Sequence, residues 1–260
     1  MSELRVAGEH RPIAGRFEGR SIIVTGAGSG IGLATTLRLA TEGASVVAVD
    51  VSAKRLEALV EQRPGLDLVP VVADVTRQND IVRIVDAAAG RVDGLANVAG
   101  IMDAFLPPAE VDDSTWDRVL AVNVTGPMQL TRAVLPIMEA VGHGAIVNVS
   151  SEATLRASVS GVAYATSKHA LNGLTRSTAM FGKDRGVRAN AVAVGAVRTN
   201  IVAPMPSETS RQVLGALMPA IVPEPVDPAE PAAAICWLLS DDASYVNGAI
   251  IPVDGGWSVV

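Results

Sequence analysis

Short apolar runs alternate with longer helical stretches from residue 21 to the end of the chain. The runs are continuous rather than alternating with polar residues, which is typical of strands covered on both faces and therefore of a parallel sheet. They lie at Ser21–Thr25, Ser45–Val49, Leu68–Ala73, Val92–Asn97, Ala145–Val149, Val187–Val192 and Ala249–Val253. Helices are expected between them, at Ile31–Thr41, Ser52–Glu61, Gln78–Ala88, Ser114–Val141, Tyr164–Phe181 and Pro228–Leu239. This repeated alternation predicts an α/β fold, with one doubly wound sheet of about seven parallel strands and helices on both faces.

One segment interrupts the alternation. Of the 15 prolines, 7 lie between Pro204 and Pro231, and proline disfavours both helix interiors and central strands. We therefore expect residues 200–227 to form a long substrate loop, with one short helix near Ser210–Leu217, and long loops of this kind often act as lids. No change in composition divides the rest of the chain. Residues 16–260 are expected to form a single domain after a flexible N-terminal extension over residues 1–15.

Composition and charge narrow the class of protein. The 260 residues are 49% hydrophobic and 18% charged, which excludes intrinsic disorder. The net charge is −6 and no block of Lys or Arg exists, so no nucleic-acid partner is expected. The single cysteine, Cys236, excludes an internal disulfide framework and fits a reducing compartment. Without an apolar stretch of transmembrane length or a secretory signal, we expect a cytoplasmic protein with no membrane association. We expect no metal site, because His143 has no cysteine or carboxylate partner directly beside it in the sequence.

A glycine-rich turn follows the first predicted strand and precedes a helix. It reads Thr25-Gly-Ala-Gly-Ser-Gly-Ile-Gly32. Glycine lets the backbone approach a pyrophosphate closely, and the N-terminus of the helix offers free N–H groups to that anion. The alternative is an ordinary glycine turn. The context predicts a Rossmann-type dinucleotide site that includes Gly26, Gly28, Ser29, Gly30, Ile31 and Gly32.

Polar residues at the ends of the next strands extend this site. Asp50 ends the second strand, where a carboxylate can accept hydrogen bonds from ribose hydroxyls and would repel a 2′-phosphate. Because neither Ser29 nor Val51 is basic, NAD is favoured over NADP. The alternative for Asp50 is to cap the helix that begins near Ser52. Further candidates for cofactor binding follow the third and fourth strands, although by position they could equally be loop-forming residues: Asp74, Val75, Asn97, Ala99 and Gly100.

Candidate catalytic residues follow the fifth strand. Tyr164 and Lys168 are four residues apart and share one helix face. A phenol has a pKa of about 10, and a nearby ammonium favours its ionised form. The alternative is an exposed contact between a cation and an aromatic ring. Ser150 and Ser151 bring hydroxyls to the cofactor side of the sheet, and Asn123 is either a polar helix residue or a buried amide that holds a water or a kink.

Together these motifs resemble the short-chain dehydrogenase/reductase family over about residues 17–257, with Asp254-Gly-Gly256 as a further match. The resemblance implies that Tyr164 is the acid/base, that Ser151, thirteen residues earlier, holds the substrate oxygen, and that Lys168 lowers the pKa of Tyr164 and binds the nicotinamide ribose. It also implies that Asn123 holds a water in a proton relay. Thr199 and the backbone of Val197 would contact the nicotinamide carboxamide.

The resemblance further implies a homotetramer. One interface would use the helices at Ser114–Val141 and Tyr164–Phe181, and the other the C-terminal end at Ile250–Val260. One departure from the family pattern is Val194, which stands where a proline is usual. It restores an N–H group and is expected to loosen the turn at the nicotinamide end.

The expected function is an NAD-dependent oxidoreductase that transfers a hydride between a secondary alcohol, or its ketone, and nicotinamide. An alternative is an NADPH-dependent 3-oxoacyl-type reductase, and an alternative of another class is a non-catalytic NAD-binding regulatory protein. Apolar side chains predict a small, apolar alcohol or ketone as the substrate: Met102, Phe105, Leu155, Val159, Met205 and Met218.

Overall fold

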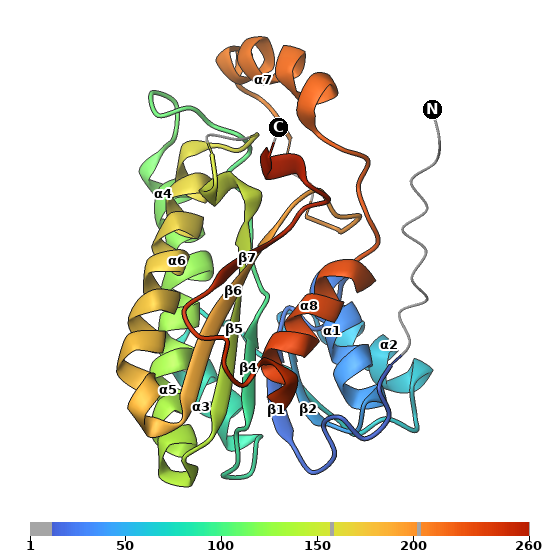
Figure 1. Ribbon diagram of the computed structural model, residues 1–260. Helices are drawn as coiled ribbons and strands as arrows, with labels where there is room; N and C mark the ends of the chain where they lie inside the picture. Colours follow the sequence, from blue (N-terminus) through green and yellow to red (C-terminus); the bar gives the residue numbers. More distant parts are fainter. Residues whose placement is uncertain (1–11, 157–158, 202–203, 260) are drawn as a thin grey trace.

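All strands of the described chain lie parallel in one sheet with the order β3-β2-β1-β4-β5-β6-β7 (Figure 1). The computed structural model describes residues 12–156, 159–201 and 204–259. The strands are β1 Ser21–Thr25, β2 Ser45–Asp50, β3 Leu68–Val72, β4 Gly94–Asn97, β5 Gly144–Ser151, β6 Val187–Val194 and β7 Ile250–Val253. The doubly wound α/β fold predicted from the sequence is therefore confirmed.

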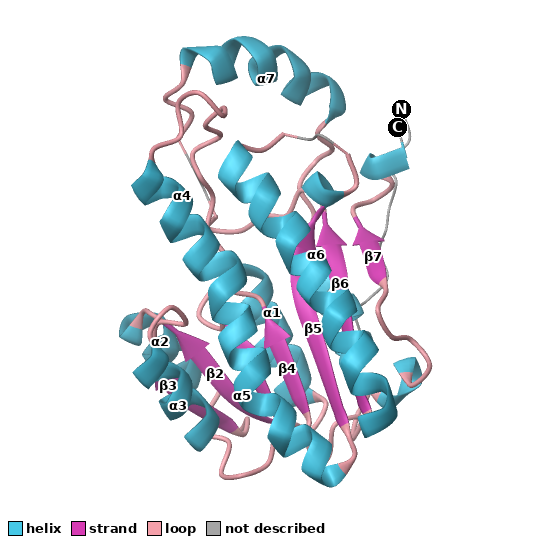
Figure 2. Cartoon of the chain, turned by 90° about the vertical axis from the view of Figure 1, so that its left-hand side faces the viewer, coloured by secondary structure: helices cyan, strands magenta, loops and turns pink. Residues whose placement is uncertain are grey.

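Helices cover both faces of the sheet (Figures 1 and 2). One face carries α1 Gly30–Thr41, α2 Ala53–Gln62 and α8 Ala229–Leu239. The other carries α3 Gln78–Asp86, α4 Asp113–Leu120, α5 Gly126–Val141 and α6 Val162–Gly182. Both faces are therefore apolar, and this explains the continuous apolar runs in the sequence. In β1, Ile22 and Val24 belong to the core beneath α1, α2 and α8, whereas Ile23 belongs to the opposite core.

The sheet order reverses beside β1. The chain moves outward from β1 to β2 and β3, then returns to the other side of β1 with β4. In sheets of this type the loops at the carboxyl ends of the two strands separate at the reversal and leave a crevice there. The glycine-rich turn after β1 and the segment after β4 border this crevice.

The sequence predicted one continuous helix from Ser114 to Val141, but the structure shows an interruption. A π-helical turn at Ala121–Thr125 separates α4 from α5. Pro127, in the first turn of α5, lacks an N–H group and cannot donate to the carbonyl of Asn123 four residues earlier. The wider turn places Asn123 in the interior, where it is buried.

Helix α7, Glu208–Ile221, occupies half of the segment that we expected to be a loop. It lies at one end of the molecule, above the N-terminus of α6 (Figure 2). The Ser207 hydroxyl caps it by accepting a hydrogen bond of 3.0 Å from the Ser210 N–H. The short helix expected near Ser210–Leu217 is therefore present, and it is longer than expected at both ends. Pro206 precedes the cap, and Pro219 lies close to the end of the helix, so it removes only one hydrogen bond of the last turn.

The N-terminal extension was expected over residues 1–15, and residues 1–11 of it lie outside the described residues. Phe17 is the first buried residue of the described chain, and it packs in the core beside α1 and α8. Cys236 is buried in α8, as expected for a structural thiol. Among the described helices, none has the length and apolar character needed to cross a membrane.

Candidate active site

The glycine-rich turn joins β1 to α1 as the sequence predicted. Gly26 has a φ of +69°, and a side chain on Gly32 would collide with the Gly26 carbonyl, so both positions require glycine. Ser29 is the N-cap of α1, but its side chain makes no capping hydrogen bond. The free N–H groups of the first turn therefore face the cavity and could hold a pyrophosphate.

Thr25 connects the ends of β1 and β4, a role that the sequence analysis missed. Its Oγ1 accepts hydrogen bonds from the N–H groups of Val98 and Ala99 at 3.0 and 3.1 Å. These contacts hold the Val98–Gly100 segment against the glycine-rich turn. A threonine at the last position of the strand, immediately before the glycines, was the available signal.

Asp50 lies at the end of β2 and faces the glycine-rich turn. One carboxylate oxygen, Oδ2, accepts from the Gly28 N–H at 3.0 Å, and the other, Oδ1, accepts from the Ser52 N–H at 2.9 Å. Arg55, in the first turn of α2, reaches to 3.9 Å from Oδ1 and lines the cavity. The sequence analysis considered only the immediate neighbours of the turn and missed this cation, which stands five residues after Asp50.

Of the later cofactor candidates, Asn97 does not face the cavity. Its side chain is buried, and its amide donates to Asn148 Oδ1 at 2.8 Å, while Asn148 in turn donates to Thr175. Ala99 and Gly100, in the loop that follows β4, line the cavity instead. Asp74 and Val75 also line the cavity.

Asp74 stabilises the loop after β3, which is one of the two roles expected from its position. Its Oδ1 accepts from the N–H and the hydroxyl of Thr76, at 2.9 and 2.7 Å. The second oxygen, Oδ2, lies 3.6 Å from Arg77. An adenine amino group would therefore meet an oxygen that already has a cation beside it.

Ser151, Tyr164 and Lys168 meet at the other end of the same cavity. Ser151 is the last residue of β5, Tyr164 lies in the first turn of α6, and Lys168 lies one turn later. The Lys168 Nζ is 5.6 Å from the centre of the Tyr164 ring and donates to the Val149 carbonyl at 2.7 Å. The i, i+4 spacing therefore points both side chains inward, as the sequence predicted.

The protonation of these groups is set mainly by their burial. Burial raises the pKa of the Tyr164 phenol, the hydrogen bond with Ser151 acts in the opposite direction, and the charge of Asp103 raises the pKa further. Burial lowers the pKa of Lys168 from 10.5 to about 8. The lowering of the Tyr164 pKa by Lys168 stays a prediction, and in the structure the ammonium donates to the Val149 carbonyl.

Asn123 holds the backbone beside this group. Its amide donates to the Ile101 carbonyl at 2.9 Å and accepts from the Ile101 N–H at 2.9 Å, and it also donates to Ser167 Oγ at 3.0 Å. Gly100 lies between the Asn123 and Lys168 side chains, and a Cβ added to it would contact both at 3.4 Å. Asn123 thus positions the Gly100–Ile101 backbone, and the proton relay through it stays a prediction.

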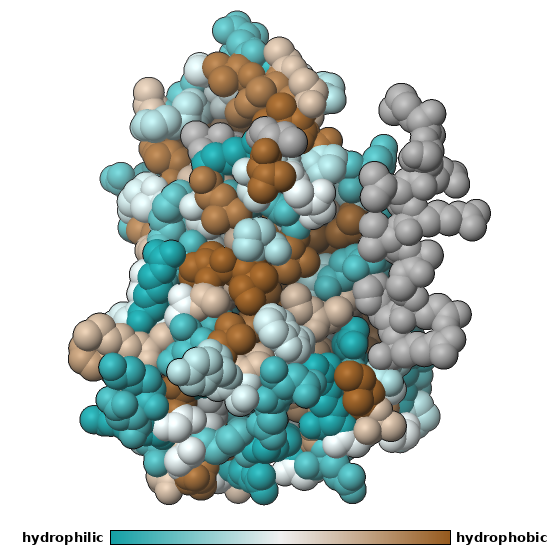
Figure 3. Space-filling view, viewed as in Figure 1, coloured by the Kyte–Doolittle hydropathy of each residue, from teal (hydrophilic) through white to brown (hydrophobic). Residues whose placement is uncertain are grey.

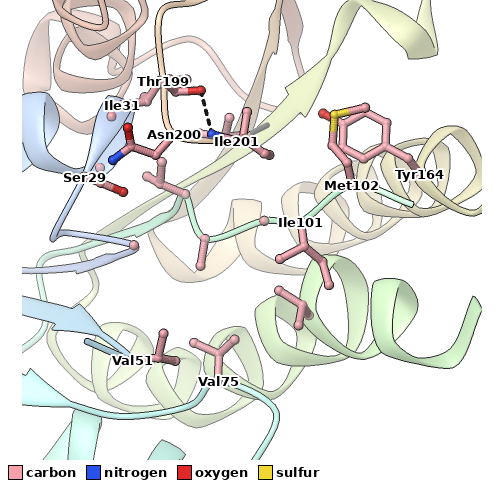
Figure 4. Close-up of a pocket in the computed structure, with 18 of the residues that line it drawn as sticks. Ser29, Ile31, Val51, Val75, Ile101, Met102, Tyr164, Thr199, Asn200 and Ile201 are labelled. Atoms are coloured by element: carbon pink, nitrogen blue, oxygen red, sulfur yellow. Dashed lines mark hydrogen bonds between the residues drawn. The ribbon is translucent and has the colours of Figure 1, made fainter. Parts of the chain in front are cut away.

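The cavity connects the two ends of the site and has a volume of about 1030 Å³. In Figure 4, Val51 and Val75 lie across the opening from Ser29, Ile31 and Thr199, and Tyr164 and Met102 lie farther along. This volume is at the upper end for a single small-molecule site and fits a dinucleotide with space for a substrate. Val197 and Thr199 also line it, and Thr199 packs against Gly30.

The apolar wall of the cavity differs from the expected one. Of the six predicted side chains only Met102 lines it, together with Ile101, Ile201 and Pro204. Leu155 is exposed, and Met205 and Met218 belong to the segment around α7 rather than to the cavity. Figure 3 shows apolar surface on α7 and below it on the same face of the molecule.

Val194 ends β6 and is paired on both sides, with Ser151 of β5 and Val253 of β7. Its restored N–H therefore belongs to a strand position in the interior of the sheet. The next residue, Gly195, donates to the Val253 carbonyl at 3.1 Å. Val194 therefore belongs to the strand and not to the turn, and a looser turn at the nicotinamide end stays a prediction.

Comparisons with known proteins agree with this geometry. Residues 26–258 match the family model described as enoyl-(acyl carrier protein) reductase. The chain is 42% identical over 250 residues to the short-chain dehydrogenase/reductase cdmF of Talaromyces verruculosus, which covers 92% of this chain and 97% of that protein.

Two solved structures are similar in fold and sequence. The crystal structure of levodione reductase superposes with a TM-score of 0.85 at 36% identity, covering 94% of this chain and 99% of that one. A structure described as an NAD(P)-dependent gluconate 5-dehydrogenase from Beutenbergia cavernae, with NADP bound at low occupancy, has a TM-score of 0.81 at 34% identity and covers 96% and 100%. With this likeness along nearly its whole length, the chain belongs to the short-chain dehydrogenase/reductase family of oxidoreductases.

Proposed function

We propose that this chain is an NAD-dependent oxidoreductase that interconverts an apolar secondary alcohol and its ketone, with Tyr164 as the general acid/base. One observation carries the proposal: Ser151, Tyr164 and Lys168 line the same cavity as the glycine-rich turn and Asp50. A group that can move a proton and a site that can hold a dinucleotide are thus within reach of one substrate.

Each of the three catalytic side chains has its own task. The Ser151 hydroxyl holds the substrate oxygen close to the Tyr164 phenol, which lines the same end of the cavity. Tyr164 gives its proton to a ketone oxygen or takes the proton of an alcohol, and the buried Lys168 ammonium stabilises the phenolate that remains. A bound nicotinamide supplies or accepts the hydride.

The cofactor would extend along the cavity from Asp50 to Tyr164. The N-terminus of α1, with Ser29, Gly30 and Ile31, suits the pyrophosphate, and Asp50 suits the adenosine ribose hydroxyls. At the other end, Thr199 and the backbone of Val197 are within the wall that would surround the carboxamide. The remaining proposed contacts are with residues of the turn and the neighbouring loops: Gly26, Gly28, Gly32, Asp74, Val75, Ala99 and Gly100.

The preference for NAD over NADP rests on the balance between Asp50 and Arg55. Asp50 is buried and its two oxygens are fixed by backbone N–H groups, so its charge cannot turn away from a 2′-phosphate. The Arg55 side chain is 46% exposed and 3.9 Å from the carboxylate, and exposed cations of this kind compensate a charge only weakly. Because the carboxylate is fixed and the cation is exposed to solvent, the two groups together would repel a 2′-phosphate, and this favours NAD.

The alternative of an NADPH-dependent 3-oxoacyl-type reductase keeps the same catalytic residues. Arg55 and the NADP in the Beutenbergia cavernae structure are the observations in its favour. The alternative of a non-catalytic NAD-binding regulator has less support, since a regulator does not require Ser151, Tyr164 and Lys168 in one cavity.

The substrate class follows from the wall beside Tyr164. Met102, Ile101, Ile201 and Pro204 are apolar, and the similar levodione reductase is named for a reduction. The test is a turnover screen of apolar secondary alcohols with NAD⁺ and of their ketones with NADH, repeated with the NADP forms and followed by nicotinamide absorbance. Turnover with NADPH alone would favour the 3-oxoacyl-type alternative. Tight cofactor binding without turnover of any substrate would favour the regulator.

Assembly as a homotetramer is part of the proposal. Helices α5 and α6 lie side by side on one face (Figure 2), and Met180 and Phe181 near the end of α6 are strongly exposed large apolar residues. Exposed apolar surface on a helical face is typical of an interface between subunits. The second interface would use the C-terminal end, where Val259 is also exposed.

The segment of residues 200–227 is proposed to act as a lid over the substrate. Its two ends are pinned together, since Val197 pairs with Val226 and Arg198 N donates to the Val226 carbonyl at 2.9 Å. Between them, α7 buries only Ser210 and exposes Val213 and Leu217. A helix with fixed ends and little packing of its own can move as a unit. The alternative is a rigid connection.

A further inference from the structure

Asp103 is a fully buried carboxylate that the proposed mechanism does not use. It lies on the loop after β4, lines the cavity, and has 0% of its surface exposed. Its Oδ2 accepts a hydrogen bond of 2.9 Å from the backbone N–H of Tyr164, and its Oδ1 accepts one of 3.2 Å from the N–H of Phe105. In the described part of the chain no lysine, arginine or histidine forms an ion pair with it. Its charge is therefore balanced by N–H dipoles and not by a cation.

The N-terminus of α6 is built to receive this carboxylate. A helix is usually capped by the side chain of its own N-cap residue, which bonds to the N–H two or three positions later. Here the N-cap is Gly161, which has no side chain, and Asp103 supplies the acceptor for the third helical residue, Tyr164. A Cβ on Gly161 would collide with the Asp103 carboxylate. The positive end of the α6 dipole points at the same group, which suits a negative charge.

The backbone that carries Asp103 is strained and held from two sides. Ala104 and Phe105 both have φ near +57°, a conformation that residues other than glycine rarely adopt. The Val162 N–H donates to the Leu106 carbonyl at 3.0 Å, and the Ser210 hydroxyl of α7 donates to the Phe105 carbonyl at 2.6 Å. Strain that the surroundings maintain is typical of segments with a functional role.

We propose that Asp103 is a positioning residue for Tyr164: it fixes the first turn of α6 against the cavity and its buried negative charge keeps the phenol protonated. This inference rests on the proposed role of Tyr164 as acid/base. The negative charge disfavours a second negative charge on the phenolate, in agreement with the raised pKa of Tyr164. Asp103 thus raises the pH at which Tyr164 loses its proton and can act as the base in alcohol oxidation.

Few other charged groups face the phenol. Lys168, on α6 itself, is the neighbouring cation. Arg118 of α4 lines the same cavity, and the turn after Ser151 carries Glu152 in an ion pair with Arg156. Asp103 is the carboxylate that raises the pKa of Tyr164, so removal of its charge is expected to lower that pKa.

The test compares Asp103→Asn with the parent, both in a Tyr245→Phe background. The chain has 2 tyrosines, and Tyr245 is fully exposed, so the tyrosinate absorbance of this background reports on Tyr164 alone. We expect the pKa of Tyr164 to fall by about one pH unit in Asp103→Asn. The rising limb of kcat against pH for alcohol oxidation is expected to move to lower pH by a similar amount. Asp112→Asn, which changes an exposed capping carboxylate of α4, is the matched control.

Gly161→Ala tests the same contact if Asp103→Asn does not fold. It keeps the charge but displaces the carboxylate from the Tyr164 N–H, and we expect kcat to fall at least about tenfold while the Kd for NAD is unchanged. An unchanged Tyr164 titration in Asp103→Asn, or unchanged kcat and titration in Gly161→Ala, overturns the proposal. The titration needs no turnover. If the protein is inactive on every alcohol, the proposed function is wrong, but the titration still shows whether Asp103 controls the pKa of the phenol.

Discussion

The Gly28 N–H donates a hydrogen bond of 3.0 Å to the Asp50 carboxylate, which joins the glycine-rich turn to the end of β2. The contact fixes a negative charge where the adenosine ribose of a bound cofactor would lie. Its partner Arg55 is close enough to interact but too exposed to neutralise it. We therefore expect the choice between NAD and NADP to depend on Asp50 and Arg55, whose effects can be separated.

We expect NAD to bind at least about 100-fold more tightly than NADP, since a like-charge contact costs several kcal/mol. Asp50→Asn should reduce this ratio, mainly by improving NADP binding. Arg55→Ala should leave NAD binding within about twofold and weaken NADP further. Calorimetric titration of each of the three proteins with both cofactors measures the six affinities. Equal affinities for NAD and NADP in the parent protein would contradict the assignment.

Tyr164→Phe should lower kcat by roughly 10²–10⁴-fold, which is the usual contribution of a general acid or base. The phenyl ring keeps its place in the cavity wall, so the Kd for NAD should change by less than about twofold. Steady-state turnover and fluorescence titration separate the two effects. Tyr245→Phe removes the same atom from a fully exposed side chain and is the matched control. Activity of Tyr164→Phe close to that of the parent would show that another group transfers the proton.

The buried ammonium of Lys168 should make stability depend on pH. Its pKa is about 8 in the folded protein against 10.5 for a free lysine, so the unfolded chain binds the proton more tightly. The cost of burying the charge is fully present below about pH 8 and disappears as the pH rises to about 10.5. At about 1.4 kcal/mol for each pH unit between the two values, the change is on the order of 3 kcal/mol.

Lys168→Met should remove this dependence. Urea unfolding of the parent and of the variant at several pH values between 7 and about 10.5 measures the difference in unfolding free energy, in which the titration of all other groups cancels. The parent should gain stability relative to the variant as the pH rises. Two curves that run parallel over this range would show that Lys168 is not destabilised by burial.

Helix α7 should exchange its amide hydrogens quickly in the free protein, because it buries only Ser210. With NAD and a substrate analogue added, closure over the cavity should slow the exchange in Glu208–Ile221. Hydrogen exchange followed by mass spectrometry measures both states, and α5 serves as the internal reference. Protection that is already high without ligand, and unchanged with it, would show that the segment is a rigid connection.

The assembled protein should have the mass of a tetramer at micromolar concentration. Phe181→Lys places a charge in the proposed α5–α6 interface and should reduce the mass to that of a dimer. Val213→Lys makes the same kind of change on α7 and should leave the mass unchanged. Light scattering of the three proteins measures the outcome. A monomeric parent would contradict the proposed assembly.

Periodicity and spacing along the chain were enough to predict the sheet, most of the helices and the main candidate residues. Strand and helix patterns depend on local periodicity, and the motif residues depend on spacing: Gly26 to Gly32 before α1, Asp50 at the end of β2, and Tyr164 with Lys168 on one helix face. Even the interruption at Asn123 had a local signal in Pro127, although the π-helical turn itself was not expected.

The contacts between side chains of separate elements could be seen only in the folded molecule. Asn97 turned into the core toward Asn148, Arg55 reached Asp50 from the next helix, and Asp103 capped the first turn of α6 through Tyr164. The contacts of Asn97 and Asp103 join residues 51 and 61 positions apart, where neither periodicity nor spacing carries information. Arg55 is close to Asp50 in the chain but lies on the next element. These contacts depend on how strands alternate, how loops fold back and which groups lose their water, and those are properties of the packed molecule.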